Sequence, residues 1–204
     1  DDGSQSLKML DGKIVSKINP DLTSEVDLTI AKTLLENSDL SFQGIAKAGS
    51  FDINQKQAAQ MFSSLNVDQE RKNEDVIKRL INAREFMGRS RNMWVIDFGE
   101  MNLSKARKYA EPFQYVEKHV KPERDKNSER KRKEKWWIHG RSRPAMRKLI
   151  KRLSRYIATP NISKHRVFNF LPLDFLPDGT LYVFVRDDYY FLGVLHSRPH
   201  ELWS

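Results

Sequence analysis

Apolar residues recur at helical spacing in several segments of the chain. Ala58, Met61, Phe62 and Leu65 fall at i, i+3, i+4 and i+7 behind Asn54, which can cap a helix. The same spacing predicts a helix at about 24–37, with Val26, Ile30, Leu34 and Leu35 on one face, and a helix after a cap at Asn73, with Val76, Ile77, Leu80 and Ile81. It also predicts a helix after a cap at Ser104 that carries Tyr109, Phe113, Val116 and Val120 and is kinked or restarted at Pro112. A further helix is predicted after Pro144, with Met146, Leu149, Ile150 and Leu153 as its buried stripe. Each helix is expected to bury its apolar stripe.

Runs of β-branched and aromatic residues bounded by Gly, Pro, Asn or Asp are typical of strands. They predict strands at 40–44, 49–53, 93–99, 156–159, 167–170 and 181–185, and the last three should be central. Residues 189–195 are apolar on all sides and follow Asp187 and Asp188, which favours a buried helix with an aspartate cap. The irregular order of strands and helices predicts an α+β (mixed α/β) fold, with one mixed sheet flanked by amphipathic helices.

Composition places the chain among globular proteins. Its 204 residues are 39% hydrophobic and include 4 Trp, 6 Tyr and 11 Phe, which excludes the disordered class and suits one fold, alone or with an appended piece. No apolar run approaches the roughly 18 residues that cross a bilayer, and residues 1–4 lack the features of a signal peptide. Because there is no cysteine, disulfides and thiolate sites are excluded and a cytoplasmic location is predicted.

The positive charge is concentrated in one third of the chain. Residues 104–166 hold 21 basic and 6 acidic residues, whereas the rest holds 15 basic and 21 acidic, which together give the formal net charge of +9. A cationic surface gains affinity for a polyanion by releasing its condensed counterions. Nucleic acid is therefore the favoured partner class, and the alternatives are a solvated basic helix or a face that docks on an acidic protein.

Catalytic patterns are weak in this sequence. It has no glycine-rich cofactor turn, and Ile18–Asp21 carries only half of an Asn-Pro-Pro-aromatic motif, so an Asn-Pro turn is the preferred interpretation. The Glu-x-Lys spacing at 129–131 is expected by chance in so charged a stretch. His196 and His200 stand four apart with Pro199 between them and no evident third ligand, so they are expected to cap or pack. No catalytic, cofactor-binding or metal-ligating residue is assigned to this chain.

Cations before and after Trp136 and Trp137 are candidate DNA contacts and fall into two groups. At least one of the two tryptophans is expected in the core. Phosphate contacts are predicted for the cations in the densest charge run and for those on the outward face of the helix after Pro144: Arg130, Lys131, Arg132, Lys133, Lys135, Lys148, Lys151 and Arg152. Arg147 lies in the same helix and is also expected to point away from the core. Base contacts are predicted for cations that flank helices and strands, whose rigid support can hold an Arg fork: Arg141, Arg143, Lys164, His165 and Arg166.

A set of sequence blocks occurs in order over most of the chain. The blocks are Leu40–Gly44 with Gly49–Ile53, Met93–Gly99, Val120–Arg124, Trp136-Trp137, Arg155–Pro160, Ser163–Arg166, and Gly193–Arg198 through Glu201–Trp203. Together they resemble the C-terminal half of MmeI-like (type IIL) adenine-specific DNA methyltransferases. Their number and order make this resemblance more specific than any single block.

The resemblance implies a division of the chain and of the chemistry. Residues 1–40 would be the tail of a methyltransferase domain, and residues 41–204 a DNA target recognition domain that in the family continues past Ser204. S-adenosylmethionine, and Mg²⁺ where a nuclease domain is present, would belong to the parent restriction-modification enzyme and not to this fragment. The fragment would bind double-stranded DNA, read a short site mainly in the major groove, and present an adenine to the methyltransferase domain of the same polypeptide, which flips it.

Two other function classes stay open. One is a small basic nuclease or an RNA-binding or RNA-processing protein, and the other is a protein-interaction domain. Mg²⁺-dependent cleavage of plasmid would favour a nuclease, whereas DNA binding without turnover would favour the recognition domain.

Overall fold

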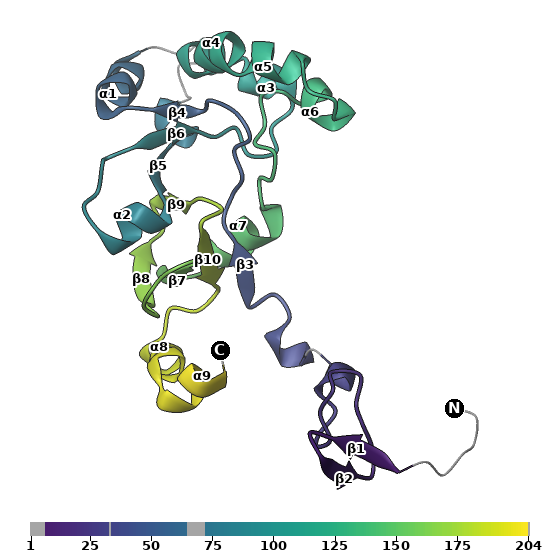
Figure 1. Cartoon of the computed structure of the whole chain (residues 1–204). Helices are drawn as coiled ribbons and strands as arrows, with labels where there is room; N and C mark the ends of the chain where they lie inside the picture. Colours follow the sequence, from purple (N-terminus) through teal and green to yellow (C-terminus); the bar gives the residue numbers. More distant parts are fainter. Residues whose placement is uncertain (1–6, 33, 65–71, 204) are drawn as a thin grey trace. The chain divides into compact units, whose positions relative to one another are not determined.

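The computed structural model describes residues 7–32, 34–64 and 72–203, and the chain divides into two units, residues 1–38 and 39–204. The elements of the first unit are β1 (Lys8–Leu10), β2 (Lys13–Val15) and two single 3-10 turns, η1 (Leu28–Ile30) and η2 (Leu35–Asn37). The strands β1 and β2 form an antiparallel hairpin (Figure 1). Asp11 and Gly12 both have positive φ, the conformation that a two-residue hairpin turn requires.

The helix predicted at about 24–37 is wrong. The side chain of Asp27 accepts hydrogen bonds from both the backbone N–H and the hydroxyl of Thr29, a local arrangement that competes with a helix. The apolar stripe also has no surface to pack against within the described part of this unit, since Val26 is 77% and Leu35 is 85% exposed. An isolated helix of this length is marginal in water without such packing.

The second unit contains two four-stranded sheets. Its strands are β3 (Ser41–Gln43), β4 (Asp52–Ile53), β5 (Ile77–Ile81), β6 (Trp94–Ile96), β7 (Arg155–Pro160), β8 (Asn169–Pro172), β9 (Phe175–Pro177) and β10 (Leu181–Phe184). One sheet has the order β3-β10-β7-β8 and is antiparallel, and the other has the order β4-β6-β5-β9, with β5 and β9 parallel. The strand at 167–170 was predicted to be central, but β8 lies at an edge.

Helices surround these sheets. They are α1 (Gln55–Ser63), η3 (Asn73–Asp75), α2 (Ala83–Met87), α3 (Leu103–Ala106), α4 (Ala110–His119), α5 (Lys121–Asp125), α6 (Arg130–Glu134), α7 (Pro144–Ile150), α8 (Tyr189–His196) and α9 (Arg198–Trp203). Within the second unit, α3 to α6 gather beside the sheet that contains β4, and α8 and α9 lie at the opposite end (Figure 1). The α+β class is confirmed, and the strands form two sheets where the sequence predicted one.

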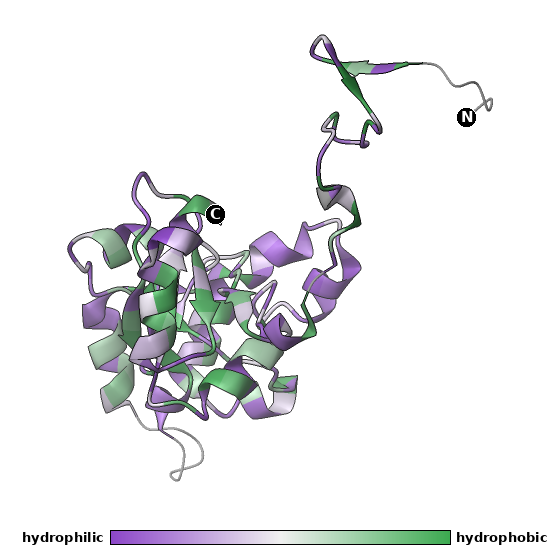
Figure 2. Ribbon diagram, turned by 90° about the horizontal axis from the view of Figure 1, so that it is seen from below, coloured by the Kyte–Doolittle hydropathy of each residue, from purple (hydrophilic) through white to green (hydrophobic). Residues whose placement is uncertain are grey.

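Most buried apolar residues belong to one cluster that takes side chains from both sheets. It includes Val95 and Ile96 of β6, Tyr156 of β7 and Leu181 of β10. Hydrophobic and hydrophilic stretches alternate along the elements that enclose it (Figure 2). The burial of these side chains is the main favourable contribution to folding.

The residues after Asn73 form a strand, so the predicted helix with a cap at Asn73 is wrong. Ile77 and Ile81 are β-branched, and β5 pairs with β6 on one side and β9 on the other. The side chain of Asn73 instead donates to the carbonyl of Met61 at 2.6 Å and so satisfies the end of α1. The helix α1 itself is confirmed, with a capping box between Asn54 and Gln57; Leu65 lies outside the described residues.

The segment predicted as one helix after Ser104 is interrupted. Asn102, not Ser104, provides the cap, because its side chain accepts from the N–H of Lys105. A new helix, α4, starts just before Pro112, as the proline predicted. Both Trp136 and Trp137 are buried, where the sequence predicted at least one of them in the core.

The C-terminal helix α8 is capped by Asp188, as predicted, but it is not buried. Leu195 packs on Phe168 and Ile157 in a small second cluster. Tyr189 and Tyr190, in contrast, are more than 70% exposed. Among the described residues, α8 packs on the rest of the unit with one face only. The sequence could not indicate which face that is, because the segment is apolar on all sides.

Candidate nucleic-acid interface

Residues 138–143, which follow the two buried tryptophans, form the centre of the site. Their backbone pairs with residues 46–47: the N–H of Gly140 donates to the carbonyl of Lys47 at 3.0 Å, and Arg141 and Ala46 exchange two hydrogen bonds. A Cβ on Gly140 would lie 2.8 Å from the Cβ of Ala48, so glycine permits this close approach. The 138–143 segment is therefore fixed in position although it is neither helix nor strand.

Buried polar groups also support the 138–143 segment. The His139 Nε2–H donates to the carbonyl of Ile96 at 2.9 Å, which assigns the proton of the neutral ring to Nε2. Ser142 is hydrogen-bonded to Glu100. Burial lowers the pKa of His139, with the nearby Asp97 acting in the opposite direction. The imidazole is therefore neutral at neutral pH and acts as a structural donor.

Arg147 joins α7 to the loop after β6, so its predicted outward orientation is wrong. Its guanidinium forms a bidentate pair with Asp97, whose side chain is only 3% exposed. Its Nε also donates to the carbonyl of Ser142 at 2.5 Å. Arg147 therefore supports the site, and it is the other three cations near α7, Lys148, Lys151 and Arg152, that are exposed.

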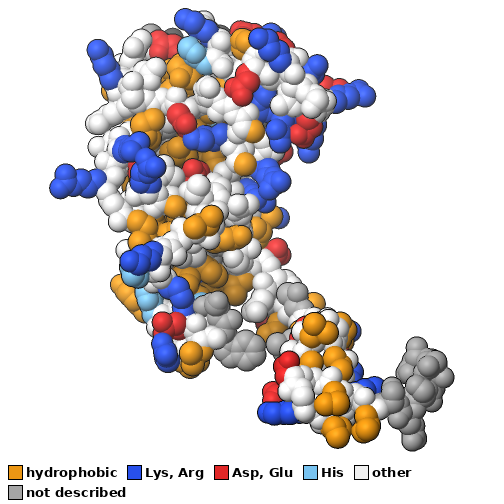
Figure 3. Space-filling model, viewed as in Figure 1, with side chains coloured by type: hydrophobic (Ala, Val, Ile, Leu, Met, Phe, Trp, Pro, Cys, Tyr) orange, Lys and Arg blue, Asp and Glu red, His pale blue; other side chains and the backbone are white. Residues whose placement is uncertain are grey.

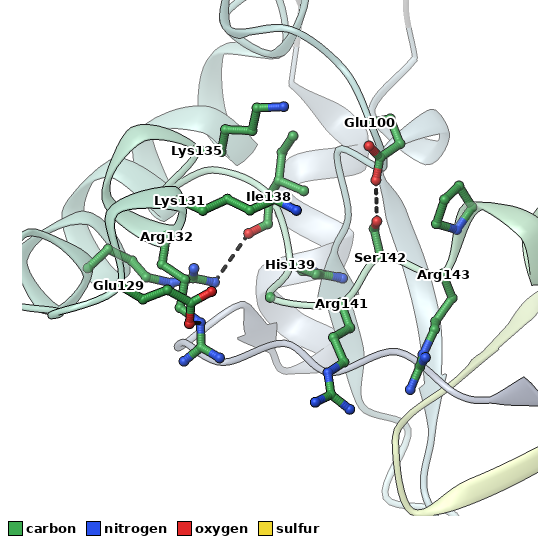
Figure 4. Close-up of a pocket in the computed structure, with 13 residues that line it drawn as sticks. Glu100, Glu129, Lys131, Arg132, Lys135, Ile138, His139, Arg141, Ser142 and Arg143 are labelled. Atoms are coloured by element: carbon green, nitrogen blue, oxygen red, sulfur yellow. Dashed lines mark hydrogen bonds and ion pairs between the residues drawn. The ribbon is translucent and has the colours of Figure 1, made fainter.

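A cavity of about 380 Å³ lies between the 138–143 segment and α6. Its cationic lining is Arg124, Lys131, Arg132, Lys135, Arg141 and Arg143, and its carboxylates are Glu100 and Glu129. Figure 4 shows Lys131 and Arg132 on one side of the cavity and Arg141 and Arg143 on the other. The structure thus brings together residues from both predicted groups, phosphate-binding and base-reading.

The predicted phosphate-binding cations of α6 differ in their ion pairs. Arg130 pairs with Glu134 at 2.6 Å, and Arg132 pairs with Glu129 at 2.7 Å. Lys131, Lys133 and Lys135 are exposed and have no ion pair with any described residue. Figure 3 shows blue Lys and Arg side chains on the part of the second unit that carries α5 and α6. A polyanion can approach these lysines without first breaking an ion pair with a described residue.

Lys148 and Lys151 border a second groove. Lys78 and Lys105 line it as well, together with Gly99 and the Asp97–Arg147 pair. Arg152 follows α7 and is exposed. These cations extend the basic surface beyond the cavity, which is the arrangement that contacts to several successive phosphates require.

The five predicted base-reading residues fall in two places. Arg141 is exposed, whereas Arg143 is half-buried and donates to the side chain of Gln43 at 2.9 Å and to the carbonyl of Gly44 at 3.2 Å. Lys164 and His165 are exposed in the loop between β7 and β8, and neither lines the cavity. Arg166 donates to the carbonyl of Leu195 at 2.7 Å, so part of its fork is used to hold α8.

Arg124 is the cavity residue that sequence reasoning missed. The almost wholly charged stretch 121–135 predicts an exposed loop or irregular helix, yet Arg124 within it has a residue exposure of 1%. Val116, Val120 and Arg124 follow one another at intervals of four, and both valines are fully buried. That helical spacing placed Arg124 on the buried face, and it was the signal that could have identified it.

The two histidines that were weighed as metal ligands, His196 and His200, have structural partners. The Nε2–H of His196 donates to the carbonyl of Phe168 at 3.0 Å, and Nδ1 of His200 lies 2.9 Å from the carbonyl oxygen of Leu195. Both rings make edge-to-face contacts with Phe168, in agreement with their expected capping or packing role. Among the described residues, no group of three or more His, Asp and Glu side chains could hold a metal ion. Asn19 lies in a turn, as predicted. In the described ranges, no helix is both long and apolar enough to cross a membrane.

Comparison with known proteins identifies the fold. No protein-family model and no curated protein sequence matches the chain. A solved structure does match: the type IIL restriction-modification enzyme MmeI, determined in complex with DNA, with a TM-score of 0.60 and 19% sequence identity. The match covers 91% of this chain and 24% of the MmeI chain, so this chain spans about a quarter of that enzyme's length. The chain therefore has the fold of one part of a restriction-modification enzyme.

Proposed function

We propose that this chain binds duplex DNA as the target recognition domain of an adenine-specific DNA methyltransferase in a restriction-modification system. The observation that carries the proposal is a fold shared with part of a DNA-bound restriction-modification enzyme, in a chain where Lys131 and Lys135, which have no ion pair with a described residue, line a basic cavity. The sequence blocks that resemble the MmeI-like family support the same assignment. A restriction-modification enzyme must recognise its site on DNA, and a basic surface on a rigid scaffold suits that task.

The cations divide into two proposed roles. The cations in and directly after α6 and those in and after α7 would contact phosphates: Arg130, Lys131, Arg132, Lys133, Lys135, Lys148, Lys151 and Arg152. Phosphate contacts position a protein on the duplex but carry no sequence information. Arg141, on the fixed 138–143 segment, is the best supported base reader, because its side chain is exposed and its backbone is held by Ala46.

The methyl transfer itself would take place in another domain of the same polypeptide. That domain would bind S-adenosylmethionine and the flipped adenine. The first unit, residues 1–38, exposes Met9, Ile14, Leu22, Val26, Ile30, Leu34 and Leu35, and Figure 2 shows green, hydrophobic stretches on its hairpin. An apolar surface of this extent is typical of an interface. We assign this surface to contact with the methyltransferase domain, in keeping with a recognition domain proper that starts near residue 41.

Binding of a labelled duplex of about two helical turns, followed by fluorescence anisotropy over a series of salt concentrations, tests the proposal. The purified chain should bind the duplex and should not cleave it when Mg²⁺ is added. Matched duplex RNA serves as the competitor. Cleavage of the DNA would support the nuclease alternative, preference for RNA would support the RNA-binding alternative, and absence of binding at low salt would leave a protein-interaction domain.

A further inference from the structure

Arg124 of α5 is a buried guanidinium that has no carboxylate partner among the described residues. Its Nη2 donates to the carbonyl oxygens of Lys47 at 3.0 Å and of Ile138 at 3.2 Å. A guanidinium has five N–H donors, so these two bonds leave three donors without an acceptor among the described residues. No described carboxylate lies within 4 Å of it, whereas the pairs of Arg132 and Arg147 meet that limit.

A buried charge of this kind is costly unless an opposite charge compensates it. Burial lowers the pKa of Arg124, and the positive charge of Arg132 lowers it further, while Glu123 and Glu129 act in the opposite direction. The guanidinium nevertheless stays charged, because arginine does not deprotonate in proteins. The two carbonyl groups, and the ring of Phe51 whose centroid lies 5.9 Å from the guanidinium carbon, supply only part of the compensation.

The surroundings of Arg124 favour an anion as the missing partner. Arg124 lines the same cavity as Lys131, Lys135 and Arg141, which have no ion pair with any described residue. The two carboxylates of the cavity are already engaged, Glu129 with Arg132 and Glu100 with Ser142. The cavity therefore has a surplus of positive charge and a buried donor group at its wall.

We propose that this cavity binds one backbone phosphate of the DNA, with Arg124 as the buried anchor and Lys131 and Lys135 as rim contacts. Arg offers a fork of donors that matches phosphate oxygens, and the fixed carbonyls of Lys47 and Ile138 hold the fork in place. The inference rests on the proposed function, since it assigns the phosphate to DNA. Its chemistry, an oxyanion on a preorganised guanidinium, also applies to inorganic phosphate, which serves as the probe.

Lys131 and Lys133 provide a matched pair of variants for the test. Both are exposed lysines of α6 without an ion pair to a described residue, but only Lys131 lines the cavity. Sodium chloride is replaced by sodium phosphate at constant ionic strength, and the melting temperature of the full 204-residue chain is recorded. Phosphate should raise the melting temperature of the wild type and of Lys133→Gln equally. Lys131→Gln should weaken the apparent phosphate affinity by about threefold to fivefold.

Duplex binding by the same variants separates this inference from the proposed function. Both Lys131→Gln and Lys133→Gln remove one cation from the proposed DNA face, so each should weaken duplex binding. An equal response of the two variants to inorganic phosphate, or no response of the wild type, would overturn the cavity site while leaving duplex binding intact. If the wild type does not bind the duplex, the proposed function is overturned instead.

A direct variant of the anchor adds a second readout. Arg124→Gln should abolish the phosphate-dependent rise in melting temperature, provided that circular dichroism shows the native fold. A merely structural role, in which Arg124 only ties Lys47 to Ile138, would lower the melting temperature but leave its phosphate dependence unchanged. If Arg124→Gln does not fold, the comparison of Lys131→Gln with Lys133→Gln still decides the question.

Discussion

The guanidinium of Arg147 lies against the carboxylate of Asp97, with Nη1 2.5 Å from Oδ2 and Nη2 3.1 Å from Oδ1. This pair fixes α7 to the loop after β6, and its two residues are 50 apart in sequence. Asp97 is almost completely buried, so it needs a cation, and Arg147 is the one that the fold supplies. The pair also holds the carbonyl of Ser142 and hence one end of the 138–143 segment.

Arg147→Met should destabilise the chain by about 3–5 kcal/mol, because it leaves Asp97 buried without its counter-charge. Lys148→Met, on the adjacent exposed position, is the control and should change stability by no more than about 0.5 kcal/mol. Urea denaturation followed by tryptophan fluorescence measures both values. Similar stabilities for the two variants would show that Asp97 is compensated in another way.

Stability should also depend on pH through Asp97. Burial by itself raises the pKa of this carboxyl, but His139, Arg147 and the N–H of Gly99 together hold the pKa below its ordinary value. Since burial keeps His139 neutral at neutral pH, Arg147 is the effective cation. A group whose pKa is depressed in the folded state contributes stability above its unfolded pKa of about 3.9, and that contribution is lost as the pH falls through the folded value.

The wild type should therefore lose stability more steeply than Asp97→Asn as the pH is lowered below about 4. Asp97→Asn is expected to be less stable than the wild type at neutral pH, where the wild-type carboxylate is charged and paired. Denaturant midpoints at a series of pH values check both statements. Parallel curves for the two proteins would mean that Asp97 does not titrate differently in the folded and unfolded chain.

Two glycines give opposite predictions for the same substitution. A Cβ at Gly140 would lie 2.8 Å from that of Ala48, and the backbone hydrogen bond between Gly140 and Lys47 prevents the segments from separating. Gly140→Ala should therefore destabilise the chain by about 1–3 kcal/mol. A Cβ at Gly193, within α8, would meet nothing within 4 Å, so Gly193→Ala should stabilise it by roughly 0.5–1 kcal/mol. Thermal unfolding of both variants tests the pair, and a stable Gly140→Ala would show that the 138–143 segment can move.

Local signals in the sequence predicted several elements well. Asn54 caps α1, Pro144 starts α7, Asp188 caps α8, and the β-rich run at 93–99 contains β6, because each of these features depends on neighbours within a few residues. Pattern alone could not decide between helix and strand at 76–81. There, pairing with β6 and β9 decided in favour of a strand, and those partners lie far away in sequence.

The site was predictable in composition but not in arrangement. The charge run led to predicted DNA contacts for Lys131, Lys135 and Arg141, and the structure places all three around one cavity. The sequence could not show that Arg147 turns towards Asp97, because that contact joins α7 to the loop after β6, and the two residues are 50 apart in sequence. The hydrogen bond from the guanidinium of Arg166 to the carbonyl of Leu195 could not be predicted either, because it also joins segments that are distant in sequence.

The salt dependence of duplex binding should be steep. If the basic surface covers roughly six phosphates, the logarithm of affinity should fall with the logarithm of salt concentration at a slope near −5. Lys133→Ala should make the slope shallower by about 1, whereas Lys56→Ala, an exposed lysine on α1 away from the cavity lining, should leave it unchanged. A wild-type slope shallower than about −2 would mean that another face binds the DNA.

The last prediction separates Arg141 from Arg166 as base readers. Arg141 is exposed on a segment whose backbone is fixed, so its fork can be held against a base edge, and Arg141→Ala should relax preference at one base position by about 1–3 kcal/mol. Arg166 already donates to the carbonyl of Leu195, so Arg166→Ala should lower thermal stability and leave base preference unchanged. Selection of bound duplexes from a random-sequence pool, with the wild type and each variant, measures these preferences directly. An unchanged consensus for Arg141→Ala together with an altered one for Arg166→Ala would move the reading function to the loop that carries Lys164 and His165.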